Sequence, residues 1–147
     1  MSKGNTFEND ILKLIFNATA IANLADNAAS SPLTNLFWAL HTADPGEAGD
    51  QTTSETTYGS YARQAVARTT GGMTASTVGS TSPVANVVFP AATSPTLPTV
   101  SSITFASIGV VISGASKILY SGPVTPNINV STGVQPILTT ASTVTED

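Results

Sequence analysis

The sequence contains no cysteine, so a disulfide framework and a thiolate metal site are both excluded. The stability of the chain must therefore come from the packing of its core and from assembly with partners. Its 147 residues are close to the usual size of one domain, and hydrophobic residues make up 41% of them. These values predict a globular chain with a well-formed core.

Charge is also scarce. Charged residues make up 10% of the sequence, against about 25% in ordinary globular proteins. The net charge is −4, and the five basic residues are too scattered to form a basic stripe: Lys3, Lys13, Arg63, Arg68 and Lys117. Nucleic acid is therefore not an expected partner. No apolar run reaches the roughly 18 residues that span a membrane, so we expect no membrane partner either.

Hydroxyl side chains take the place of the missing charges, with 17 Ser and 23 Thr. This composition disfavours helices and suits strands and turns. Short apolar or alternating runs, separated by Gly, Pro, Ser and Asn clusters, cover residues 35–41, 61–69, 73–78, 85–89, 100–112, 117–121, 127–130 and 134–140. Seven to nine short strands predict a mainly β fold, an antiparallel β-sandwich or jelly roll.

The N-terminal segment has the pattern of a helix. Asn5 and Glu8 have the spacing of a capping box, and apolar residues then recur at helical intervals. The pattern predicts one amphipathic helix from about Thr6 to Ala25, followed by a turn.

The apolar stripe of this helix has two interpretations. Phe7, Ile11 and Ile15 either pack on the β body of the same chain or contact a neighbouring subunit. We therefore divide the chain into residues 1–33, the helix and linker, and residues 34–147, the β body.

The predicted β body differs from most β proteins in its lack of charge. Both faces of the run 35–41 are apolar, which predicts a central strand. Lys117 is the only charged residue between Arg68 and Glu146. Charges usually protect the edges of sheets, so we expect these edges to be closed or covered by partners.

His41 is the only histidine, so a catalytic triad would have to include it, with Asp44 three residues away. The sequence has neither a nucleophile elbow nor a glycine run that could form an oxyanion hole. The alternative is a histidine that is hydrogen-bonded at a strand end. We therefore expect a protein that is not an enzyme and binds no cofactor.

The segment of residues 40–68 is acidic and rich in Gly and Thr. Asp44, Glu47 and Asp50 could offer oxygen ligands to calcium, although their spacing does not match the EF-hand pattern. The alternative is a solvated connector between two strands, with a turn at Asp44. We favour the connector for all the acids of this segment, including Glu55.

Several runs of the sequence resemble a known family: LHTADPGEAGDQTTSE, then YARQAVART and GG, and later FASIGV, KILYSGPV and INVSTGVQP. They are similar to small virion proteins of tailed bacteriophages, which are labelled tail-fibre-like or head decoration (cement) proteins. The resemblance covers roughly residues 35–140. It implies a jelly-roll or β-sandwich protein of the virion, made in the cytoplasm of the bacterial host and without catalytic residues.

The leading hypothesis from this resemblance is a capsid decoration protein. The resemblance implies a homo-oligomer, a dimer or trimer, on the outer surface of an HK97-type capsid, where it clamps adjacent major capsid proteins. Phe7, Ile11 and Ile15 are the candidate contacts. Two alternatives stay open. One is a tail-fibre or tail-tip component, and the other is a binding module for calcium or carbohydrate that would use the loop acids or the rings of Trp38 and Tyr58.

Overall fold

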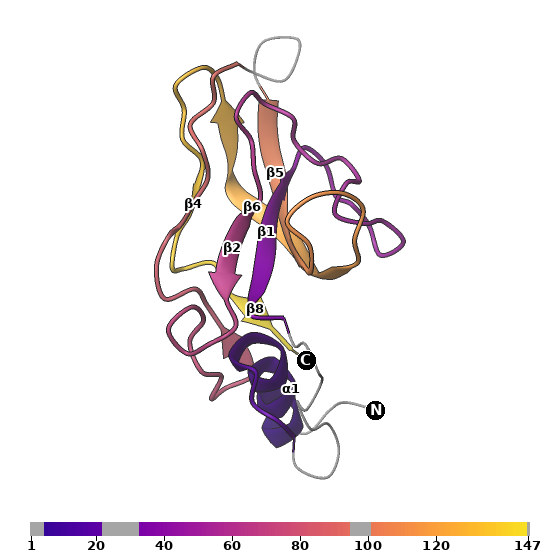
Figure 1. The fold of residues 1–147 in the computed structure, drawn as a ribbon, viewed down its shortest axis with the longest axis vertical. Helices are drawn as coiled ribbons and strands as arrows, with labels where there is room; N and C mark the ends of the chain where they lie inside the picture. Colours follow the sequence, from indigo (N-terminus) through magenta and orange to yellow (C-terminus); the bar gives the residue numbers. More distant parts are fainter. Residues whose placement is uncertain (1–4, 22–32, 95–100, 147) are drawn as a thin grey trace. The chain divides into compact units, whose positions relative to one another are not determined.

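The computed structural model describes residues 5–21, 33–94 and 101–146. It contains one helix and eight strands in these residues (Figure 1). Their bounds are α1 Asn5–Asn17, β1 Asn35–His41, β2 Gln64–Ala67, β3 Ser80–Thr81, β4 Val87–Val88, β5 Ser101–Gly109, β6 Ile118–Val130, β7 Ile137–Leu138 and β8 Val144–Thr145. The fold is mainly β with antiparallel sheets and one short N-terminal helix, as the sequence predicted. The described helix is too short to cross a membrane.

The largest sheet has four strands in the order β2-β1-β5-β6. β1 pairs antiparallel with β5, from Phe37 opposite Gly109 to His41 opposite Phe105. The residues of β1 from Trp38 to His41 are all buried. A strand that buries side chains on both faces belongs inside a sheet, so the central position predicted for this run is confirmed.

β6 forms one edge of this sheet and has 13 residues. The sequence pattern predicts two strands here, but register shifts against β5 allow the two runs to join into one. Pro123 and Pro126 lie within the strand. Prolines and bulges hinder pairing at an edge because they remove N–H donors and distort the backbone. This edge therefore has a defence that the charge count alone does not reveal.

The chain folds into two compact units, each made of segments that are distant in the sequence. The first unit comprises Met1–Leu36, Val66–Asn86 and Leu138–Asp147, and the second comprises Phe37–Ala65 and Val87–Ile137. The division of the chain at residue 33, into a helix with its linker and a β body, stays a prediction.

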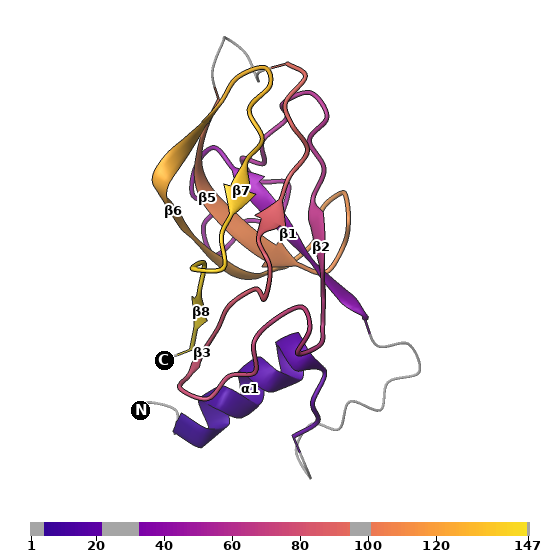
Figure 2. The same ribbon diagram turned by 90° about the vertical axis from the view of Figure 1, so that its left-hand side faces the viewer.

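The second unit has two layers. β4 pairs with β7, and hydrogen bonds from Phe89 N to Pro136 O (3.0 Å) and from Ala92 N to Val134 O (2.9 Å) extend this pairing. Figure 2 shows β7 in front of the four-stranded sheet. The ring of Phe89 stacks on that of Tyr61, with centroids 6.3 Å apart. This arrangement is that of a small β-sandwich.

The first unit is built around one side of α1. Leu12 and Phe16, one turn apart, are almost completely buried. The side chain of Asn9 extends this buried side, because its Oδ1 accepts hydrogen bonds from Ser76 Oγ and Gly79 N, both at 2.7 Å. These contacts attach the helix to the loop that precedes β3.

The predicted strand at residues 73–78 is wrong. The amides of Gly72 and Met73 both donate to the carbonyl of Thr69, which closes a tight turn. Met73 then forms only an isolated bridge with Pro83. The predicted strand 61–69 shortens to β2 because turns lie on both sides of it: Tyr61 N donates to Tyr58 O (3.0 Å) before the strand, and the turn at Thr69 follows it.

The helix also ends earlier than predicted. α1 ends at Asn17, and residues 22–25 of the predicted helix lie outside the described residues. Ala18 has φ of 53°, in the left-handed region, which ends a helix. The amide of Thr19 donates to the carbonyl of Lys13 (3.1 Å) instead of continuing the α-helical pattern.

Arg68 holds the end of the helix in place. Its Nε donates to Ile15 O (2.6 Å), its Nη2 to Leu14 O (2.8 Å) and its Nη1 to Leu33 O (2.7 Å). The guanidinium thus satisfies two carbonyls of the last helical turn and places a positive charge at the negative end of the helix dipole. It also joins this turn to the chain just before β1.

We expect Arg68→Met to lower the free energy of unfolding by roughly 2–4 kcal/mol, because three carbonyls lose a charged donor. Arg68→Lys should recover only part of this loss, since one ammonium cannot reproduce the fork of donors. Lys117→Met removes the same charge from an exposed side chain and should change stability by less than about 0.5 kcal/mol. Urea denaturation followed by circular dichroism measures all three. Equal effects of Arg68→Met and Lys117→Met would refute the role of Arg68.

Candidate functional site

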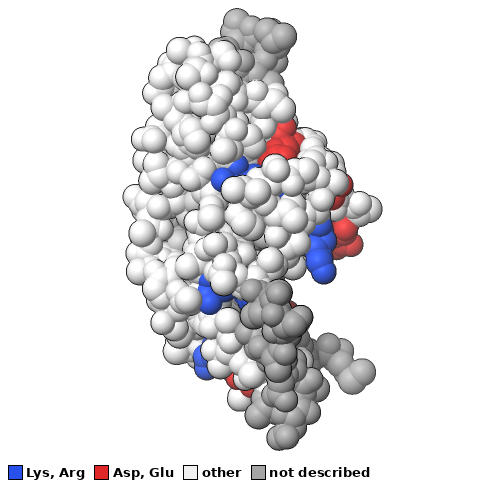
Figure 3. All heavy atoms as spheres, in the orientation of Figure 1, with Lys and Arg blue, Asp and Glu red and all other residues white. Residues whose placement is uncertain are grey.

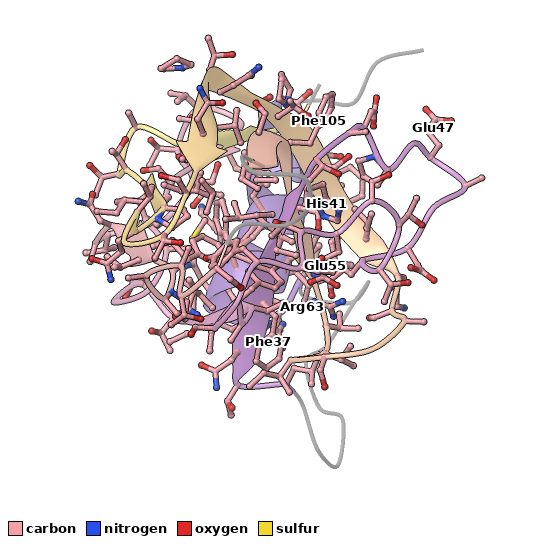
Figure 4. The ribbon with its side chains drawn as sticks, turned by 90° about the horizontal axis from the view of Figure 1, so that it is seen from above. Phe37, His41, Glu47, Glu55, Arg63 and Phe105 are labelled. Carbon is pink, nitrogen blue, oxygen red and sulfur yellow. The ribbon has the colours of Figure 1, made fainter. Side chains whose placement is uncertain are left out.

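The acidic segment of residues 40–68 belongs to the second unit as far as Ala65, and its last residues belong to the first unit. Figure 4 shows Glu55 and Arg63 beside each other and near His41, whereas Glu47 lies far out on the loop. The segment therefore divides into a buried polar group and an exposed acidic loop.

A bidentate ion pair forms the centre of the buried group. Arg63 Nε lies 2.7 Å from Glu55 Oε1, and its Nη2 lies 2.8 Å from Oε2. The two side chains are only 2% and 15% exposed. The hydrogen bond to Glu55 raises the pKa of Arg63. The interpretation of Glu55 as a solvated loop acid is therefore wrong, because Glu55 is the internal partner of a buried cation.

Tyr61 connects the ion pair to β1. Its hydroxyl donates to Glu55 Oε1 (2.9 Å) and accepts a hydrogen bond from Leu40 N (3.0 Å). Burial raises the pKa of Tyr61 well above its usual range, so the hydroxyl keeps its proton and remains a donor.

Gln51 extends the group to the other side of Arg63. Its Oε1 accepts from Arg63 Nη1 (3.2 Å), and its Nε2 donates to Phe37 O (3.0 Å). The same Nη1 also donates to Val111 O (3.1 Å). A Cβ at Gly109 would clash with the amide end of the Gln51 side chain, so a larger residue there would displace this amide from its hydrogen bonds. The loop, β1 and the end of β5 are thereby held together.

His41 forms a second link between this loop and the sheet. It is fully buried, and its Nδ1 lies 2.8 Å from Thr53 O. Nδ1 must donate to this carbonyl, so Nε2 is left to accept the hydroxyl of Ser107 at 2.7 Å. Asp44, the expected partner in a triad, bonds elsewhere. Because both His41 and Ser107 are buried, this pair is out of reach of a substrate.

The exposed acids of the loop are occupied in local turns. Asp44 Oδ1 accepts from Gly46 N (2.8 Å). Asp50 Oδ1 accepts from both the Oγ1 (2.6 Å) and the N (2.7 Å) of Thr52, and these bonds lower the pKa of Asp50. Such Asx turns are typical of connectors. Within residues 5–21, 33–94 and 101–146, no three His, Asp or Glu side chains group together in a way that could hold a metal ion.

The aromatic residues considered for carbohydrate binding are not at the surface. Trp38 is 4% exposed and Tyr58 is 2% exposed. The hydroxyl of Tyr58 donates to Pro90 O (3.0 Å), and burial raises the pKa of Tyr58 to about 12. Both rings therefore belong to the core of the second unit.

Of the three candidate contact residues, Phe7 and Ile11 lie on the side of α1 opposite Phe16, and Ile15 lies between that side and Leu12. Phe7 is 40% exposed, and Ile11 and Ile15 are partly exposed. The predicted stripe exists, but the helix uses its other side to pack on its own unit.

The surface has little charge outside these features. In Figure 3, uncharged residues cover most of the visible face, and acidic groups gather over the loop between β1 and β2. A hollow of about 370 Å³ in the first unit is lined by two carboxylates and polar backbone: Glu8, Asn9, Thr77, Val78, Gly79, Thr145 and Glu146. The side chains of Arg63 and Arg68 are engaged internally.

Removing one partner of the Glu55–Arg63 pair should be costly. We expect Arg63→Met or Glu55→Gln to lower the free energy of unfolding by about 3 kcal/mol, because a buried charge loses its partner. The double variant should lose less than the sum of the two, since it leaves no unpaired charge. Glu47→Gln, in the exposed part of the same loop, is the control and should be nearly neutral. Chemical denaturation of the four variants tests this, and additive single effects would contradict the coupling.

His41 should make stability depend on pH. Burial lowers the pKa of His41, although the hydrogen bond to Thr53 and the charge of Glu55 partly oppose this and Arg63 reinforces it. The unfolded histidine binds a proton near pH 6.5, and the folded one binds it only at lower pH. Its contribution to stability is therefore complete above pH 6.5 and is lost as the pH falls below 6.5 toward the folded pKa.

Urea denaturation at intervals between pH 7.5 and 5.5 measures this effect. Since the chain has a single histidine, His41→Gln should flatten the pH dependence in this window even if the variant is less stable at every pH. An unchanged slope in the variant would show that other groups are responsible.

Comparison with known proteins agrees with the resemblance found in the sequence. A family model described as podophage GP4 fiber I protein gp80 matches residues 2–145, which include α1 and every strand. No curated protein matches the chain. The chain therefore belongs to the podophage GP4 fiber I protein gp80 family and is a structural protein of a phage virion.

Proposed function

We propose that this chain is a subunit of a fibre on the podophage particle, and that it acts by binding neighbouring proteins without catalysing a reaction. The observation that carries the proposal is the family match, which runs from residue 2 to residue 145 and names a fibre protein. The match includes segments of both compact units, so it concerns the whole architecture and not one motif.

The buried polar groups support a role without catalysis. His41, Glu55 and Arg63 are of the residue types that most often act in catalysis. Here these side chains hold the loop after β1 to the sheet. A general base or nucleophile has to reach a substrate, which these groups do not. Their rigidity suits a protein that must keep its shape on a particle.

The attachment surface that we propose is the side of α1 with Phe7, Ile11 and Ile15. Phe7 is 40% exposed and Ile11 and Ile15 are partly exposed, whereas Leu12 and Phe16 are buried in the first unit. The partner is a neighbouring structural protein of the virion. Repeated copies would strengthen such a contact by avidity.

Capsid decoration would use the same fold at another place on the particle. A decoration protein clamps adjacent major capsid proteins and is present in hundreds of copies, whereas a fibre subunit is present in few. Location and copy number therefore separate the two functions.

Electron cryo-microscopy of purified particles tests the proposed function, with particles from a phage that carries a stop codon in this gene as the control. We expect density for this chain in appendages of the tail, in low copy number, and its loss in the control. Density spread over the capsid surface would overturn the fibre assignment in favour of decoration. Absence of the chain from the particle would overturn both.

A further inference from the structure

The outer layer of the second unit carries apolar side chains on its surface. Phe89 N donates to Pro136 O, and the next bond along the layer joins a later donor to an earlier acceptor, so β4 and β7 run antiparallel. Phe89 and Pro136 are buried, and the adjacent pair in this register is Val88 and Ile137. Side chains alternate along a strand, so these two point away from the four-stranded sheet, and they are 41% and 40% exposed.

No charged side chain interrupts this surface. Pro90 lies two residues after Val88 and Gln135 lies two residues before Ile137, so we group these four residues as the β4–β7 face. From β4 to β7 the only charged residue is Lys117, which lies just before β6. Figure 3 accordingly draws no charged atoms over β4, which Figure 1 labels at the left. Covering the β4–β7 face would therefore remove no charge from water.

The charged side chains of the second unit lie elsewhere. Its exposed acids belong to the loop after β1, which Figure 1 shows on the opposite side of the four-stranded sheet from β4. Lys117 forms an isolated β-bridge with Asp50 of this loop, so it lies on that side too. Glu55 and Arg63 are buried against each other. The second unit is therefore charged on one side and uncharged on the other.

We propose that the β4–β7 face packs on the same face of a second copy of this chain, about a twofold axis. The sequence has a net charge of −4, so two copies repel each other least when the acidic sides of their second units are turned apart, as this contact requires. The face is also complementary to itself, because Val88 and Ile137 offer apolar area and the amide of Gln135 both donates and accepts hydrogen bonds. A charged partner would find no opposite charge on this face.

Self-association of the purified full chain tests this inference without a phage particle, so the result does not depend on the fibre function. The variants Ile137→Lys and Ile137→Glu each place like charges in the centre of the proposed contact. Ile112→Lys and Ile112→Glu are the matched controls, because Ile112 is a 61% exposed isoleucine of the same unit and lies in the loop between β5 and β6. Analytical ultracentrifugation at about 20 mM NaCl, where charges interact over roughly 20 Å, measures the dissociation constant of the dimer.

We expect the wild-type chain to form dimers at concentrations of about 100 μM, as is typical of a small interface. Each Ile137 variant should raise the dissociation constant at least about 100-fold, because like charges meet in an apolar contact. An equimolar mixture of Ile137→Lys and Ile137→Glu should form a mixed dimer again, because the two charges are then opposite. The Ile112 variants should dimerise as the wild type does. Thermal melting of each variant identifies any loss caused by unfolding.

Other outcomes overturn the inference. A wild-type chain that stays monomeric up to about 1 mM would exclude the contact between copies and leave the β4–β7 face to a different virion protein. A dimer that persists in the folded Ile137 variants would use another surface. Equal losses in the Ile137 and Ile112 variants would show a general effect of added charge. A mixture of the two Ile137 variants that does not associate would show that the two faces do not meet.

Discussion

The fold of the second unit depends on the buried guanidinium of Arg63. Removing this cation from water is costly, and the cost is offset because each nitrogen of the guanidinium finds an acceptor: both oxygens of Glu55, the amide oxygen of Gln51 and the carbonyl of Val111. These acceptors come from the loop after β1 and from the chain after β5. The ion pair and Gln51 therefore hold this loop on the sheet, where the side chain of Gln51 lies against Gly109.

The same use of arginine recurs in the first unit, where Arg68 binds the last carbonyls of α1. In a chain with five basic residues, both arginines are thus engaged in internal structure. The outward-facing charge of the described residues is mainly acidic or absent. This engagement of both arginines explains why a charge count alone revealed neither internal connection.

The sequence predicted much of the fold where the local pattern was strong. The mainly β class, the N-terminal helix and the central position of β1 are confirmed, because each depends on periodicity along one segment. The end of the helix and the strand at residues 73–78 were wrong, because the bonds that decide them come from Arg68 and from the turn at Thr69. For the candidate site, Glu55 was misjudged. The available signal was Arg63 on the same face of the predicted strand 61–69 as Tyr61, Ala65 and Ala67, since a buried cation requires an acidic partner.

The sequence by itself determined the fold class, the family and the presence of a helix with apolar residues around much of its circumference. Only the tertiary structure decided that Leu12 and Phe16 turn inward while Phe7 and Ile11 stay outward. The physical reason is that helical periodicity reports which residues share a side but not which side finds a partner. That choice depends on contacts with segments far away in the chain, such as the bonds of Asn9 to the loop before β3, whose energies no local pattern contains.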